Sequence, residues 1–242
     1  MSYAKIAGSN LYTVAKRNGV AMRTIAKYGA LSNINSGLIG WWKFDEASGA
    51  SAADSSGNGI TGTLVNAPSW VAGKINNALD FNGSTQYVTM GDVAALEGLT
   101  DLTISAWISL DAWPAGGNVS FMSGKEDVYK VDITDAGKVR FLTGDNWTGS
   151  ILTSASALSV ATWYHIVAVK NGTTKTIYIN AVSDATAGTT GGSVGSNTNA
   201  VQVGARNAAP ADTFNGQIDD VRIYNRALSA DDIAALYNVT AP

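Results

Sequence analysis

The stretch of sequence that decides the fold lies near the end of the chain and reads FNGQIDDVRIYNRALS, from Phe214 to Ser229. Apolar residues and charges alternate between Ile218 and Tyr224, as they do in a half-buried β-strand. Ser229 then precedes a short run, residues 230–237, that carries two aspartates in its first turn. A serine N-cap followed by acidic residues favours a helix start. The stretch therefore predicts a strand that leads directly into a short C-terminal helix.

Upstream of this stretch, short runs of Val, Ile, Tyr and Trp are separated by segments rich in Gly, Ser, Thr and Asn. More than ten short strands at such spacing indicate two packed antiparallel sheets. We therefore predict an all-β fold, a two-sheet antiparallel jelly-roll sandwich. The strands are expected at residues 37–44, 78–81, 87–90, 102–110, 119–124, 129–134, 138–143, 163–170, 175–182, 200–203 and 217–224.

Composition excludes several classes of function. The 242 residues include no Cys, carry a formal net charge of −3 and are only 14% charged. Disulfides and thiolate metal sites are thus excluded, and no basic surface for nucleic acid is expected. No apolar run approaches the ~20 residues of a membrane span. No signal peptide is visible at the N-terminus.

Residues 1–36 differ from the rest because they contain a repeat. Ala4-Lys5, Ala15-Lys16 and Ala26-Lys27 recur at a regular spacing, and glycines between them disfavour a helix. Asn18-Gly19 is typical of a hairpin turn. We expect a small N-terminal β-meander in this leader, followed by one domain over 37–242. A ribbon of this size cannot bury a core alone, so the leader should pack on the domain, on a second copy or on a larger assembly.

Several segments resemble, in order, the laminin G-like, concanavalin A-like jelly rolls found in bacteria and phages. They are GLIGWWKFDEASG (37–49), GKINNALDFNGSTQYVTM (73–90), WYHIVAVKNGTTKTIYINAV (163–182) and the closing strand and helix. The resemblance covers about 200 residues and implies a binding domain that acts outside the cell. One departure is Asn180-Ala181, which stands where the family has Asn-Gly. Alanine disfavours the positive φ of a tight type I′ turn, so this turn is not expected.

The resemblance also implies a structural Ca²⁺ ion between the first strand, the second hairpin and the last strand. It assigns the carboxylate ligand to Asp219 and main-chain oxygens to the regions of Asp45 and Gly83. Calcium accepts such mixed oxygen ligands. Asp54 and Asn58 offer similar oxygens in the polar loop 54–59. Alternatively, these two side chains only support turns of their own backbone.

Two tryptophans, Trp113 and Trp147, lie in polar, Gly-rich loops rather than in strands. An exposed indole ring can stack on a sugar while neighbouring polar groups bind its hydroxyls. The residues expected to bind carbohydrate are Trp147, Asn146, Asp145, Trp113, Arg206 and Asn207. The alternative is that each loop Trp folds back to cover the end of the sandwich.

Catalysis is not expected. Glycosidases need two carboxylates that reach the substrate together, whereas Glu126 and Asp127 are adjacent and would point to opposite faces of a strand. Asp132 and Asp135 flank an apparent turn, and His165, the only histidine, lies within a strand. A structural role for His165 is therefore favoured over a general base.

These observations favour a non-catalytic, lectin-like module for carbohydrate binding or adhesion. The leader resembles those of phage structural proteins, which suggests presentation on a virion or extracellular surface, with homo-oligomers or a larger assembly formed through residues 1–36. The two ideas are compatible. The alternatives are a glycoside hydrolase and a stand-alone secreted carbohydrate-binding module.

Overall fold

The computed structural model describes residues 34–144, 151–188, 192–206 and 212–240, together with two short backbone segments near the N-terminus. These segments, β1 (Lys16–Arg17) and β2 (Val20–Ala21), pair antiparallel with Arg17 opposite Val20. The turn expected at residues 18–19 lies outside the described residues. The other parts of the expected meander lie outside the described residues.

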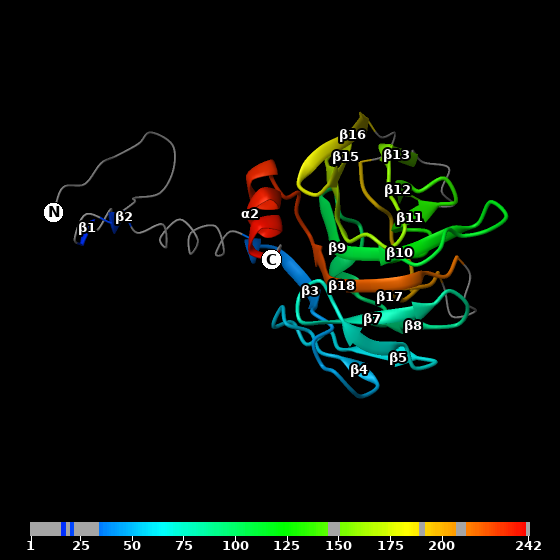
Figure 1. Ribbon diagram of the computed structural model, residues 1–242. Helices are drawn as coiled ribbons and strands as arrows, with labels where there is room; N and C mark the ends of the chain where they lie inside the picture. The colour runs from blue at the N-terminus through cyan, green and yellow to red at the C-terminus, as the bar shows by residue number, and fades with distance from the viewer. Residues whose placement is uncertain are drawn as a thin grey trace.

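Two antiparallel sheets stack to form the sandwich, as predicted (Figure 1). The first sheet has the order β13 (Ile151–Ala157), β12 (Lys138–Thr143), β11 (Tyr129–Thr134), β10 (Val119–Lys125), β17 (Val201–Val203), β8 (Tyr87–Thr89), β5 (Gly62–Val65) and β4 (Ser51–Ala52). The second has the order β16 (Val182–Gly188), β15 (Thr174–Ile179), β14 (Tyr164–Asn171), β9 (Leu102–Leu110), β18 (Asn215–Tyr224), β7 (Asn77–Asn82) and β6 (Ser69–Ala72), with β3 (Leu38–Trp42) also paired to β18. A short 3₁₀ helix, η1, covers Ala94–Leu96, and helix α2 covers Ala230–Thr240.

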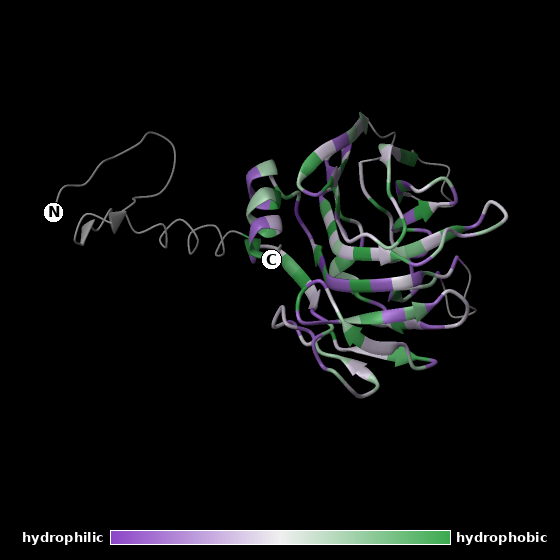
Figure 2. Cartoon of the chain, viewed as in Figure 1, coloured by the Kyte–Doolittle hydropathy of each residue, from purple (hydrophilic) through white to green (hydrophobic). Residues whose placement is uncertain are grey.

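The main core lies between the sheets, and β9 illustrates how it is built. Apolar and polar residues alternate along the strands (Figure 2). Leu102, Ile104 and Ile108 of β9 belong to the core between the sheets, whereas Ser105 and Trp107 lie on the opposite face of the strand. All residues of β9 are nevertheless buried, because helix α2 covers the outer face of this part of the sheet.

A second apolar cluster attaches α2 to that outer face. Ile233 and Leu236 of the helix pack with Tyr224 of β18 and Leu38 of β3. Ile34 belongs to the same cluster and is only 1% exposed. The packed domain therefore includes Ile34, ahead of the boundary expected at residue 37.

Helix α2 begins as the sequence predicts. The Oγ atom of Ser229 accepts a hydrogen bond from the N–H of Asp232 at 3.1 Å, and the Asp232 carboxylate accepts one from the N–H of Ser229 at 3.1 Å. This reciprocal pair is a capping box. The helix extends to Thr240, beyond the expected end at Tyr237. No helix in the described ranges is long and apolar enough to cross a membrane.

The turn between β15 and β16 corrects an expectation. Asn180 and Ala181 have φ values of 52° and 64°, and Ile179 lies opposite Val182. A two-residue turn with both φ values positive is what a tight hairpin of type I′ requires. Asn180 is held by hydrogen bonds with the backbone of His165, at 2.8 and 2.9 Å. These bonds fix the turn although its second residue is alanine.

Candidate functional site

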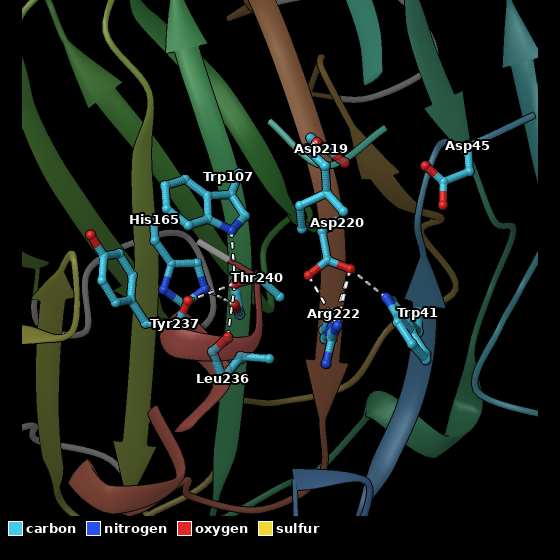
Figure 3. Close-up of polar contacts among 12 residues, drawn as sticks. Trp41, Asp45, Trp107, His165, Asp219, Asp220, Arg222, Leu236, Tyr237 and Thr240 are labelled. Atoms are coloured by element: carbon cyan, nitrogen blue, oxygen red, sulfur yellow. Dashed lines mark hydrogen bonds and ion pairs between the residues drawn. The ribbon is translucent and has the colours of Figure 1, made fainter. Parts of the chain in front are cut away.

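The first of two candidate sites is a cavity of about 350 Å³ beside β3, β18 and the end of α2. Asp45, Asp219 and Asp220 all line it, and we call it the carboxylate cavity. Figure 3 shows these residues together with the polar cluster beneath α2.

A β-bulge places the two aspartates of β18 at this cavity. Asp219 pairs with Trp107 of β9, but the next paired residue, Arg222, lies opposite Ser105. β18 therefore carries one extra residue in this interval, and Asp220 has a left-handed φ of 50°. In a regular strand consecutive side chains point to opposite faces. The bulge instead lets both carboxylates border one cavity.

The Asp219 carboxylate is buried and only half satisfied. Asp219 is 0% exposed, and its Oδ2 accepts a hydrogen bond from the N–H of Ile75 at 2.8 Å. Oδ1 has no hydrogen-bond partner among the described residues. Burial, and then the charges of Asp220 and Asp45, raise the pKa of Asp219 to about 8 despite the opposing effect of the Ile75 hydrogen bond. A bound cation would relieve this cost of burying a carboxylate.

Asp45 lies at the same cavity and binds the same loop as Asp219. Oδ1 of Asp45 accepts the N–H of Asn77 at 3.3 Å, and its carbonyl accepts the Asn77 side-chain amide at 3.2 Å. The loop approaches closely at Gly73, where a Cβ atom would lie 2.7 Å from Oδ2 of Asp219. The structure thus brings Asp45 and Asp219 together, as the resemblance implies.

Gly83 does not join them. It follows β7, whereas Ile75 and Asn77 lie at the start of that strand. The Gly83 carbonyl accepts a hydrogen bond from Oγ1 of Thr213 at 2.6 Å, and Gly83 lines the second cavity instead. The placement of Gly83 beside Asp219 is therefore corrected. Gly83 follows the end of β7, whereas Asp219 of β18 lies beside the start of β7.

Asp220, unlike Asp219, is paired with a cationic side chain. Its Oδ1 accepts hydrogen bonds from Nε1 of Trp41 and from Nη2 of Arg222, the latter at 3.1 Å. The Arg222 guanidinium also lies 4.1 Å from the centre of the Trp41 ring. Of the three carboxylates that line the cavity, Asp220 is paired with Arg222, whereas no ion pair to Asp219 occurs among the described residues.

The cavity offers carboxylate and amide oxygens as donors, and the cationic residues Lys43 and Arg222 also line it. No group of three or more His, Cys, Asp or Glu side chains that could hold a metal ion occurs in the described part of the chain. A Ca²⁺ ion here would use Asp219 and Asp45 together with carbonyl or amide oxygens, which calcium accepts.

The side chains of Asp54 and Asn58 bind the backbone around their own loop. Asp54 accepts backbone N–H groups of Trp41, Ser56 and Ile60 at 2.8–3.0 Å. Burial raises the pKa of Asp54, but these hydrogen bonds outweigh it and lower the pKa below its ordinary value. The Asn58 amide donates to two carbonyls of β3 at 2.9 and 3.0 Å. This geometry matches the turn-supporting alternative.

His165 lies beneath α2 in a closed polar cluster (Figure 3). Its Nε2 is 2.9 Å from Oγ of Ser105, and its ring centre is 5.1 Å from that of Trp107. Trp107 in turn donates to Oγ1 of Thr240 at 3.0 Å, near the end of the helix. Burial, and then the charge of Arg222, lower the pKa of His165 to about 3. A neutral, structural histidine results.

The second candidate site is a cavity of about 560 Å³ at one end of the sandwich, which we call the Trp113 cavity. Trp113 is half-buried and packs against the main core. Its ring also lies over Gly137, where a Cβ atom would be 2.9 Å away. The polar residues that line the cavity with it are Asn118, Ser120, Arg206, Asp212, Thr213 and Asn215. Trp113 therefore both covers the core and borders a polar cavity.

The structure brings together two of the six residues expected to bind carbohydrate, Trp113 and Arg206. Asp145, Asn146, Trp147 and Asn207 lie outside the described residues. Asp212 was not identified from the sequence, because an isolated aspartate in an irregular loop carries no periodic signal. Its left-handed φ of 51° and its ion pair with Arg206 at 2.7 Å emerge only in the fold.

Two of the acidic residues considered for catalysis, Glu126 and Asp132, form ion pairs. Glu126 contacts Arg206 at 3.1 Å. Asp132 contacts Arg140 at 2.6 Å and Lys130 at 3.0 Å. Asp132 lies inside β11 and is fully buried, so its expected position beside a turn is corrected.

Comparisons with known proteins agree with this fold. The binding domain of Paraclostridial Mosquitocidal Protein 1 superposes with a TM-score of 0.70 at 17% identity, over 85% of this chain and 53% of that one. Domain 4 of AbnA, an extracellular GH43 arabinanase from Geobacillus stearothermophilus solved with arabinotriose, gives 0.63 at 20% identity, over 85% and 98% of the two chains. Botulinum neurotoxin type C, in a structure describing cell entry through two ganglioside molecules, gives 0.67 at 16% identity, over 87% and 53%.

This chain thus spans about half the length of the two toxin structures. At these identities the likeness concerns the fold. No curated protein matches the sequence. A family model described as the concanavalin A-like lectin/glucanases superfamily matches residues 82–234, which is more than half of the chain. The chain therefore belongs to the concanavalin A-like lectin/glucanases superfamily.

Proposed function

We propose that this protein is a non-catalytic, lectin-like recognition module that binds glycans in the Trp113 cavity. The observation that carries the proposal is the position of Trp113, whose half-buried ring borders a polar cavity of about 560 Å³. A fixed aromatic face with amide and hydroxyl groups around it is what a sugar-binding site requires. The complex of the similar AbnA domain with arabinotriose supports the same ligand class.

A glycan microarray followed by calorimetry tests this proposal on the full chain. We expect binding to at least one oligosaccharide and a loss of affinity of about fivefold in Trp113→Ala, since aromatic contacts contribute about 1 kcal/mol beyond buried area. Asn118→Ala changes an exposed lining residue and should weaken binding without altering the fold. Trp163→Ala, which removes a half-buried ring that does not line the cavity, is the matched control.

Two outcomes would contradict the proposal. One is the absence of binding to any glycan on the array. The other is binding that survives both Trp113→Ala and Asn118→Ala, which would place the glycan elsewhere on the protein.

We further propose that a Ca²⁺ ion stabilises the domain at the carboxylate cavity, with Asp219 and Asp45 as its carboxylate ligands. The buried Oδ1 of Asp219, which lacks a hydrogen-bond partner among the described residues, supports this assignment. When bound, the ion would supply the positive charge that Asp219 lacks. In this proposal the ion has a structural role, since Asp219 is fully buried.

We also propose that residues 1–36 attach the module to a virion or extracellular surface, through a homo-oligomer or a larger assembly. The support is the repeat in this leader, which contains too few apolar residues to close a core by itself. Backbone pairing between β1 and β2 is compatible with strands that pair further with another chain.

A further inference from the structure

The two charged residues described at the Trp113 cavity are paired with each other. Nε of Arg206 lies 2.7 Å from Oδ2 of Asp212. Nη1 of the same guanidinium lies 3.1 Å from Oε1 of Glu126. Arg206 therefore already contacts two carboxylates before any ligand enters.

The ion pairs continue away from the cavity with alternating sign. Asp212 lies 3.8 Å from Nζ of Lys130, which lies 3.0 Å from Asp132. Asp132 is then bound by Arg140 at 2.6 Å. Among the described members of this network, the number of carboxylates equals the number of cationic groups. The charge on Arg206 is thus compensated within the protein.

The remaining polar groups at the cavity are neutral. Ser120 is 1% exposed, and its Oγ has no hydrogen-bond partner among the described residues although it lines the cavity. The amide side chains of Asn118 and Asn215 lie at the same cavity. Hydroxyl and amide groups can donate and accept hydrogen bonds, which matches the hydroxyl groups of sugars.

We infer that the Trp113 cavity selects neutral oligosaccharides over anionic ones, and that the Arg206–Asp212 pair sets this selectivity. The inference rests on the proposed glycan-binding function. A carboxylate or sulfate on a sugar would have to displace Asp212 or Glu126 from Arg206, or lie close to both negative charges. A sugar hydroxyl can bond to either member of the pair without separating them.

The first experiment compares matched neutral and acidic sugars on the wild-type full chain. Suitable probes are galactotriose with trigalacturonic acid, cellotriose with its glucuronate counterpart, and lactose with sialyllactose. We expect the neutral member of any bound pair to bind at least tenfold more tightly at low salt, where charge repulsion is least screened.

The second experiment changes the charge alone. Asp212→Asn keeps the side-chain shape and the main-chain carbonyl that accepts the N–H of Phe121 at 2.9 Å, but it leaves Arg206 with a single carboxylate partner. The ratio of anionic to neutral affinity should rise about tenfold, since close charge pairs strongly alter partner choice. Asp231→Asn makes the same charge change at an exposed position on α2 and should leave the ratio unchanged. Thermal melting checks that both variants are folded.

The outcomes separate this inference from the proposed function. Preference of the wild type for the acidic sugars would overturn the selectivity and leave glycan binding intact. An equal ratio in wild type and folded Asp212→Asn would overturn the role of the pair. Failure to bind any neutral or acidic probe would overturn the selectivity, whereas only the absence of binding across the whole glycan array would overturn the proposed function.

Discussion

The main-chain N–H of Ile75 donates a hydrogen bond to Oδ2 of Asp219 over 2.8 Å, while the other oxygen of that carboxylate has no hydrogen-bond partner among the described residues. The loop and the strand are therefore joined through a buried carboxyl group whose pKa is raised to about 8 by burial. Asp45 holds the same loop through Asn77. Any cation at this point would join the loop to both β18 and the segment after β3.

We predict that calcium raises the thermal stability of the wild-type protein. A ligand present at 100 times its dissociation constant adds about 2.7 kcal/mol to the free energy of unfolding. Excess chelator should therefore lower the melting temperature measured by calorimetry, and Asp219→Asn should abolish this response. Asp54→Asn is the control and should retain it, because the Asp54 carboxylate already accepts several hydrogen bonds. A wild-type melting curve insensitive to both calcium and chelator would rule out the site.

We predict that His165 makes the stability depend on pH. Its pKa is about 3 in the folded protein and about 6.5 in an unfolded chain. Below pH ~6.5 the unfolded chain takes up a proton that the folded protein does not. Stability should therefore fall as the pH drops from ~6.5 towards ~3, by up to about 1.4 kcal/mol per pH unit.

Denaturant titrations of the wild type and His165→Gln at several pH values measure this contribution. As the pH falls, the unfolding free energy of the wild type should decrease more than that of His165→Gln, because glutamine takes up no proton. If the unfolding free energies of the two proteins change with pH in parallel, His165 does not contribute to the pH dependence of stability.

We predict that Ala181→Gly stabilises the protein. Ala181 has a φ of 64°, a left-handed conformation that costs an L-residue about 1–2 kcal/mol and that glycine adopts freely. After the entropy lost by glycine on folding, a gain of about 0.5–1 kcal/mol should remain. Chemical denaturation measures it. Ala187→Gly, at an exposed position within β16, should destabilise the protein instead, and a loss of stability in both variants would contradict the argument.

We predict that the domain can be separated from the leader only ahead of Ile34. Removal of residues 1–33 should leave a folded monomer, whereas removal of residues 1–36 also removes Ile34, which is 1% exposed in the cluster beneath α2. Loss of a buried Ile side chain costs about 2–5 kcal/mol, which thermal melting of the two truncated proteins will detect.

Light scattering of the same proteins tests assembly. The full chain should form a homo-oligomer or attach to a larger particle, and the protein lacking residues 1–33 should not. If the full chain and the truncated protein have the same monomeric mass, and neither binds a particle, the leader does not mediate assembly.

The sequence by itself predicted the sandwich, because its signals are local. The strands expected at residues 102–110, 129–134 and 138–143 agree with β9, β11 and β12. Ser229 and Asp232 form a cap within one turn of helix. By contrast, β13 (Ile151–Ala157) was missed because its residues are mostly small or polar, and only pairing with β12 makes it a strand.

Tertiary structure decided everything that depends on residues distant in sequence. The bulge in β18 arises from its register against β9, and it is this register that places Asp219 and Asp220 at one cavity. Arg206 and Asp212 form an ion pair at 2.7 Å, which no local pattern in the sequence announces. Asp45 could be placed near Asp219 through family resemblance, whereas Gly83 could not, because only strand pairing determines which end of β7 meets the last strand. Local patterns encode elements, but a site is made by the packing that brings those elements together.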